Sequence, residues 1–142
     1  MKTIAAIVLG LAVCSTAVAQ EKRPYKEGTV TSVSFIRTKP GHFDEYMRWL
    51  LGPYKSLMEA QKKAGLIVDH RIYAATPKNP HEADLILTVT YPNMAALDRS
   101  DEADAVSSKV MGSFANQEKE YADRGTMREV LGSELVRELT AR

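Results

Sequence analysis

Residues 84–91 read Asp-Leu-Ile-Leu-Thr-Val-Thr-Tyr, and this stretch decides the fold of the chain. Leucine, valine and tyrosine occupy every second position, and Asp84, Ile86 and two threonines lie between them. An alternation with period two is typical of a β-strand that turns one face to a core. Pro92 and Asn93 follow directly, and asparagine is a favoured residue at the start of a helix. The stretch therefore predicts a strand that passes straight into a helical region.

Two further stretches upstream have the character of strands. Residues 29–37 are rich in threonine, valine, phenylalanine and isoleucine, and turn-forming residues follow at 38–41. Residues 66–74 alternate in the same way, and the proline-containing segment 76–83 separates them from the strand at 84–91. The sequence thus predicts two strands joined by a loop, preceded by a separate first strand.

A helix is predicted between the first two strands. From Phe43 to about Ala64, apolar residues recur at intervals of three and four, which is the period of an amphipathic helix. Gly65 lies in the usual position for a helix C-cap. Pro53 lacks the N–H group that would bond the Trp49 carbonyl, so we expect a kink or bulge at this point.

A second helical region is predicted downstream of Asn93. A first turn covers Met94–Leu97, and the main helix runs from about Glu102 to Gly125. The apolar positions of residues 127–139 fit either a strand face or a helix. Gly132 and the order of the elements favour a bulged strand.

The resulting order is β-α-β-β-α-β, which predicts an α+β domain with a ferredoxin-like sandwich. Four strands would form an antiparallel sheet, and both helices would cover one face. We expect apolar side chains, such as Val30, Ile36, Ile67 and Ile86, on the other face. One layer of helices leaves that face open, so we predict a homodimer that closes an α/β barrel around a two-fold axis.

The first residues of the chain have the pattern of a secretory signal peptide. Lys2 is followed by an apolar stretch at 4–13, and the small residues 17–19 fit a cleavage site before Gln20. A membrane anchor is the alternative, but the apolar run is about half the roughly 20 residues that a spanning helix needs. A second alternative is a lipoprotein modified at Cys14, although the preceding valine is larger than a lipobox prefers.

These features predict an exported protein, periplasmic or secreted, in four segments. Residues 1–19 form the signal peptide, 20–28 a flexible leader, 29–139 a single domain, and 140–142 a short tail. No membrane association is expected after the signal peptide is removed.

Composition and motifs exclude several kinds of function. The 19 Lys and Arg residues nearly balance 18 Asp and Glu, which gives no electrostatic case for nucleic acid or an anionic membrane surface. The single cysteine cannot form an internal disulfide. Histidines at 42, 70 and 81 lack metal-ligand spacing, and the chain has no glycine-rich phosphate loop. We therefore predict no metal site and no cofactor.

Three junctions resemble those of a known superfamily. They are Lys39-Pro40-Gly41 followed by Phe43–Tyr46, then Ala64-Gly65-Leu66, and finally Tyr91–Leu97. Residues 29–139 resemble the dimeric α/β-barrel superfamily, in particular the antibiotic-biosynthesis-monooxygenase-like, NIPSNAP-like and EthD-like domains. The resemblance implies a homodimer, but the superfamily spans oxygenases, haem-degrading enzymes, cyclases, isomerases and proteins without known activity.

The chain departs from the enzymes of that superfamily at two places. Haem-degrading members resemble one another in an axial histidine on the second helix, whereas residues 93–124 contain none. Oxygenase members often share an asparagine on the first strand, where this chain has serines. No catalytic set can be transferred from the resemblance.

His70 is the candidate catalytic residue, and a group of aromatic residues is the candidate ligand site. His70 shares a strand face with Ile72 that we expect to point at the helices, where it acts as a general base or as a core histidine. Flat apolar ligands suit aromatic walls. The predicted ligand-binding residues are Tyr46, Trp49, Tyr54, Phe35 and Phe114.

A polar barrel interior is predicted for the opposite face of the sheet. The residues assigned to it are Ser32, Ser34, Asp69, Arg71, Tyr73 and Thr88. The simpler alternative is a dimer seam held by an Asp–Arg pair.

Three hypotheses follow for the function. The first is an exported dimer that binds a small apolar or aromatic molecule between sheet and helices. The second is a cofactor-free oxygenase or cyclase with His70 as general base. The third is a structural or interaction dimer.

Overall fold

The computed structural model describes residues 22–142. The predicted signal peptide and Cys14 lie outside the described residues. The elements, in chain order, are β1 (Tyr25–Thr38), α1 (Phe43–Trp49), the π-helix η1 (Leu50–Tyr54), α2 (Lys55–Lys63), β2 (Asp69–Ala74), β3 (Leu85–Tyr91), the 3₁₀-helix η2 (Met94–Asp98), α3 (Ser100–Met111), α4 (Phe114–Arg124) and β4 (Arg128–Ala141).

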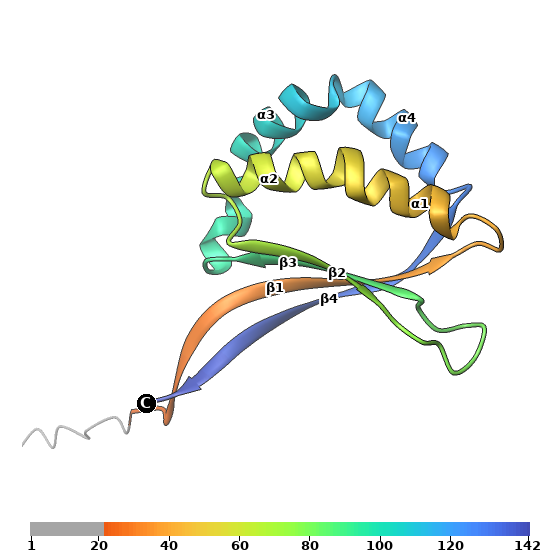
Figure 1. The fold of residues 1–142 in the computed structure, drawn as a ribbon. Coiled ribbons are helices and arrows are strands. Elements are labelled where there is room, and N and C mark those ends of the chain that lie inside the picture. Colours follow the sequence, from red (N-terminus) through yellow and green to blue (C-terminus); the bar gives the residue numbers. More distant parts are fainter. Residues whose placement is uncertain (1–21) are drawn as a thin grey trace, which may run out of the picture.

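The strands form one antiparallel sheet in the order β2-β3-β1-β4. All the helices lie over one face of this sheet (Figure 1). The predicted ferredoxin-like β-α-β-β-α-β sandwich is confirmed.

Pro53 produces the predicted irregularity in the first helix. The chain widens into the π-turn η1, where the Lys55 N–H bonds the Leu50 carbonyl five residues back. Residues five apart in a regular α-helix diverge by about 140° around the axis. The extra residue of the π-turn brings Trp49 and Tyr54 close together, with ring centroids 5.6 Å apart. The turn therefore places two aromatic rings on one side of the helix.

The second helical region differs from its prediction. The main helix is divided into α3 and α4 at Gly112, whose φ of 85° is one that glycine adopts readily. Ser113 then caps α4 by accepting a hydrogen bond from the Asn116 N–H. Asn93 caps η2 as predicted, through the Ala96 N–H.

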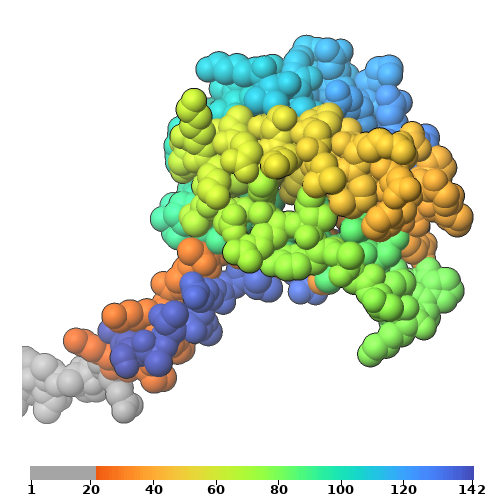
Figure 2. All heavy atoms as spheres, in the orientation of Figure 1, coloured from red at the N-terminus to blue at the C-terminus, as the bar shows by residue number. Residues whose placement is uncertain are grey.

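The strands β1 and β4 are longer than predicted at their free ends. Tyr25 pairs with Ala141, so the last part of the predicted leader and most of the predicted tail are strand. Together they form a two-stranded arm that projects from the body of the molecule (Figures 1 and 2). The predicted bulge near Gly132 is present, since Leu131 is the extra residue between two successive pairs with β1.

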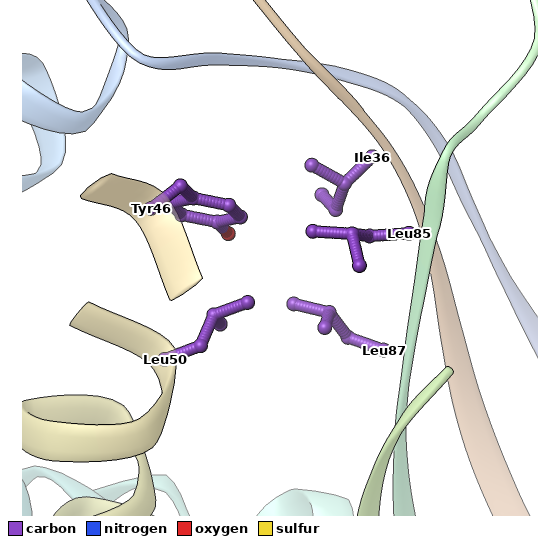
Figure 3. Packing of buried hydrophobic residues seen from close by; sticks show 5 residues of the cluster. All are labelled: Ile36, Tyr46, Leu50, Leu85 and Leu87. Atoms are coloured by element: carbon purple, nitrogen blue, oxygen red, sulfur yellow. The ribbon is translucent and has the colours of Figure 1, made fainter. Parts of the chain in front are cut away.

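The core lies between the sheet and α1–α2. Its first cluster joins two residues of the helix to three of the strands (Figure 3): Tyr46, Leu50, Ile36, Leu85 and Leu87. A second cluster forms around Met58, Leu66 and Ile67. The sheet is thus anchored to the first helical layer along its length.

The expectation that Val30, Ile36 and Ile67 face away from the helices was wrong. Ile36 and Ile67 belong to the two clusters beneath the helices. Val30 is paired directly with Tyr91, which packs against the second cluster. Directly paired residues of an antiparallel sheet point to the same side, so Val30 also faces the helices. The first strand carries apolar residues at both phases, so its alternation alone does not fix which phase is buried.

Candidate functional site

An aromatic row runs across the inside of the molecule from α1 to β2. The rings of Tyr46 and Trp49 are stacked with centroids 5.9 Å apart, and Trp49 is followed by Tyr54. Tyr54 in turn stacks on His70 at 6.3 Å. The row joins three of the predicted ligand-binding residues to the predicted catalytic residue. Tyr46 is fully buried in the core, so most of this row fills space that the prediction assigned to a ligand.

His70 lies at one end of the row and faces the helices, as predicted. Its side chain is 16% exposed, and its Nε2 is 3.6 Å from Glu59 Oε1. Its Nδ1 is buried and has no hydrogen-bond partner in the part of the chain that the structure describes. A small hollow of about 160 Å³ adjoins it, lined by Leu51, Tyr54, Lys55, His70, Arg71 and Ile72.

Tyr54 acts in this hollow as a neutral phenol. Burial, with smaller contributions from Tyr46 and Tyr91, raises the pKa of Tyr54 to about 12. A phenol with that pKa stays protonated at neutral pH, so it can donate a hydrogen bond but does not serve as a general base.

A second hollow of about 240 Å³ opens at the other side of the row, between the helices. Its lining residues belong to two helical segments, α1–α2 and α3–α4: Trp49, Tyr54, Leu57, Met111, Gln117, Glu120 and Arg124. The walls combine aromatic and aliphatic groups with a few polar ones, which is the usual composition of a small-molecule site.

Buried polar atoms without partners concentrate around this second hollow. Within residues 22–142, five such side-chain atoms are found, and four belong to Trp49, Glu120 and Arg124. The fifth is His70 Nδ1. Buried polar groups are nearly always hydrogen-bonded, so a group of unpaired ones calls for an explanation.

Two arginines stand beside the hollow. The Arg124 guanidinium lies 4.1 Å above the Trp49 ring and 5.6 Å from that of Tyr121. The Arg128 guanidinium lies 5.3 Å from the same tyrosine ring, and its Nε donates to Tyr46 Oη at 3.2 Å. Burial and the neighbouring charge of Arg128 lower the pKa of Arg124.

The sequence did not single out these arginines. A basic residue at the end of a helix is ordinarily explained by the helix dipole, and Arg124 occupies that position in α4. Arg128 follows four residues later at the start of β4. Only the packing of both against the aromatic row distinguishes them from surface charges.

The open face of the sheet carries part of the predicted barrel interior. Asp69, Tyr73 and Thr88 lie there, and Arg71 bonds Asp69 through its Nε at 2.8 Å within the same strand. That hydrogen bond is the main reason the pKa of Asp69 is lowered.

Ser32 and Ser34 were assigned to the wrong face. They pair with Val89 and Leu87, which point to the helices, so the two serines lie on the helix side.

Two predicted ligand-binding residues lie apart from the aromatic row. Phe35 pairs with Ile86 and is on the open face of the sheet, because the strand phase was assigned wrongly there too. Phe114 begins α4 and is 73% exposed. Neither lines either of the two hollows.

The described part of the chain offers neither a cluster of metal ligands nor a membrane-spanning helix. Residues 22–142 contain no group of three His, Cys, Asp or Glu side chains placed to hold a metal ion. None of the helices in this range has the length and apolar character to cross a membrane.

Comparison with known proteins places the fold. No protein-family model matches the chain, and no curated protein matches it. Among solved structures, HapK from Hahella chejuensis is similar at 14% identity and a TM-score of 0.53, over 80% of this chain and 95% of that one. Protein SO0527 from Shewanella oneidensis is similar at 16% identity and a TM-score of 0.53, over 82% and 99%.

A dimeric ferredoxin-like protein from an uncultured marine organism is similar at 11% identity and a TM-score of 0.50, over 82% of this chain and 90% of that one. The chain has a ferredoxin-like fold. At these identities the likeness concerns the fold, and it agrees with the superfamily resemblance seen in the sequence. Function has to be inferred from the site itself.

Proposed function

We propose that this protein is an exported homodimer that binds a small, largely apolar molecule in the hollow between its helices. The observation that carries the proposal is that Trp49, Glu120 and Arg124 line one hollow and hold four buried polar atoms without a hydrogen bond within residues 22–142. A bound molecule with polar atoms at one end would satisfy them, and Leu57 and Met111 would cover its apolar part.

The dimer is supported by the open face of the sheet. The helices cover the other face, and the residues left uncovered include Val33, Phe35, Ile86 and Tyr73. Apolar residues in the middle of a sheet are stabilised by a second layer. One of the similar structures is described as a dimeric ferredoxin-like protein, which fits a second copy as that layer.

The dimer is tested by charging the open face. Phe35→Glu places a carboxylate in the centre of the proposed interface, and we expect the variant to be monomeric at micromolar concentration in native mass spectrometry. Phe114→Glu makes the same change at an exposed position of α4 and should leave the dimer intact. A Phe35→Glu variant that stays dimeric would show that the sheets do not meet face to face.

Ligand binding is tested by native mass spectrometry of the mature protein purified gently from its own source. We expect a dimer that retains a stoichiometric extra mass, which would also give the class of the ligand. Trp49 is the only tryptophan, so its fluorescence reports on the hollow directly. Two results together would favour a structural dimer. One is a dimer without extra mass, and the other is a Trp49 emission that stays the same after small molecules are extracted from the folded protein.

A second candidate function is general-base catalysis by His70. The observation in its favour is that His70 has a carboxylate beside Nε2 and a buried, unpaired Nδ1. A histidine oriented in this way can take a proton from a substrate in the adjoining hollow. His70→Gln should then lower turnover of a substrate found for the protein by about 10²–10⁴-fold. A rate unchanged by that substitution would remove the candidate.

A further inference from the structure

The hollow between the helices has an excess of positive charge. Arg124 lines it, and Arg128 lies behind Tyr121, with which both guanidiniums are in contact. Glu120 is the one acidic residue among those lining the hollow. Arg124 and Glu120 balance on the lining itself, and Arg128, which is close enough to lower the pKa of Arg124, brings the local net charge to about +1.

Arg124 is poorly neutralised by Glu120. Its side chain is 13% exposed, and its Nη1 is 3.7 Å from Glu120 Oε2. Among residues 22–142, neither of those two atoms has a hydrogen-bond partner, and Arg124 Nε also lacks one. A guanidinium presents its donors as a planar fork that matches a carboxylate, and here two donors of the fork are buried and unused. Arg124 lines the hollow, so a ligand there meets these donors once the guanidinium turns toward it.

Arg128 adds a positive charge, and within residues 22–142 it forms no ion pair. It is 9% exposed, and its guanidinium contacts the rings of Tyr46 and Tyr121 and donates to the Tyr46 hydroxyl. Ring faces attract a guanidinium but carry no net charge. A positive charge held in a partly desolvated place strengthens the attraction of a nearby anion.

We propose that the hollow recognises the carboxylate of a small aromatic monocarboxylic acid. Arg124 binds the carboxylate directly, the unpaired Trp49 Nε1–H supplies a second donor, and Arg128 supplies charge from behind. A monoanion balances the local net charge of about +1, whereas a phosphate dianion would leave an excess of negative charge beside Glu120. The apolar side of the hollow, with Tyr54, Leu57 and Met111, takes the ring. This inference rests on the proposed function, because it specifies the molecule bound there.

The test compares two probes of nearly the same shape, 2-naphthoate and 2-naphthamide. The sole tryptophan gives a single indole N–H signal in the NMR spectrum of the labelled dimer, and its shift reports binding. Affinities are measured by calorimetry. Because a hydrogen bond to a charged partner is stronger than a neutral one, we expect the acid to bind about 10- to 100-fold more tightly than the amide.

Variants locate the effect. Arg124→Gln should remove the preference for the acid, and Arg124→Lys, which keeps the charge but not the fork, should retain part of it. Arg48→Gln is the matched control, since Arg48 is exposed on α1. Circular dichroism establishes that each variant is folded.

Two results would overturn the inference, and they differ in what they leave standing. Equal affinity of the acid and the amide would refute recognition of the anion and leave binding in the hollow intact. An indole signal that neither probe moves would refute both the inference and the proposed function of the hollow.

Discussion

His70 and Arg124 contact different rings of one aromatic row, Tyr54 and Trp49, and they differ in how each carries its charge. Within residues 22–142, each has a buried nitrogen without a hydrogen bond and a carboxylate nearby, at 3.6 Å for His70 and 3.7 Å for Arg124. Histidine can lose its charge at modest cost, so a site with one free nitrogen is compatible with an ordinary core residue. Arginine keeps its charge, and its burial has to be compensated.

The sequence singles out the histidine but not the arginine. A histidine is conspicuous in a sequence because it titrates near neutral pH, whereas an arginine at a helix end is expected on general grounds. In the described part of the chain, the arginine side holds four of the five buried side-chain atoms without a hydrogen bond and the larger of the two hollows that adjoin the row. The less conspicuous residue therefore marks the better candidate site.

The largest expected effect concerns Trp49, which lies in the middle of the row. Trp49 contacts Tyr46 and Tyr54 and lies under the Arg124 guanidinium. Trp49→Ala should lower the free energy of unfolding by about 3 kcal/mol, since a large ring is removed from a packed row. Urea denaturation followed by circular dichroism measures it. A loss below about 1 kcal/mol would mean that the row is a loose surface feature and that neither side is preorganised.

A smaller effect separates the two tyrosines of the row. Tyr46→Phe removes the hydroxyl that accepts from Arg128 Nε, and leaving that buried donor unpaired should cost about 1–3 kcal/mol. Tyr54→Phe is the matched control, because no hydrogen bond of its hydroxyl is found in the described residues, and it should change stability by no more than about 0.5 kcal/mol. Equal losses in urea denaturation would show that Arg128 does not depend on Tyr46.

Much of this architecture follows from local sequence patterns. The strand at 84–91, the cap at Asn93, the irregularity at Pro53 and the bulge near Gly132 each have a local physical cause, and each was predicted. The division at Gly112 was missed, because apolar residues continue the helical period on both sides of it.

The features that the sequence did not predict depend on how the strands pair with one another. Phe35 and the serines of β1 were placed on the wrong faces, since that strand has apolar residues at both phases and only its pairing with β3 decides between them. The arginine site has the same origin. Arg128 is 82 residues from Tyr46 in the chain, and no local pattern connects them.

A further prediction contrasts function with stability on the arginine side. Replacing both partners of a poorly neutralised ion pair by apolar residues is often neutral or stabilising, whereas removing one partner leaves the other charge uncompensated. The double variant Arg124→Met/Glu120→Met should therefore change the free energy of unfolding by no more than about 1 kcal/mol, although it removes the proposed ligand contact. Arg124→Met alone should lower it more, because Glu120 loses its partner and Trp49 its guanidinium. A clear loss of stability in the double variant would identify Arg124 as a structural residue.

The smallest effect lies on the open face, away from both hollows. The Arg71 hydrogen bond lowers the pKa of Asp69 below its ordinary value, so the ionised carboxyl favours the folded state. This contribution is complete above the unfolded value of about 3.9 and is lost as the pH falls through the lower, folded value. The urea midpoint of the wild type should thus exceed that of Asp69→Asn at neutral pH, and the two should converge near pH 2. In an Arg71→Gln background the difference should shrink without vanishing, because the His70 backbone N–H and Lys62, whose Nζ is 3.5 Å from Asp69 Oδ1, also favour the ionised carboxyl. A difference of unchanged size would show that the hydrogen bond from Arg71 is not the main source of the effect.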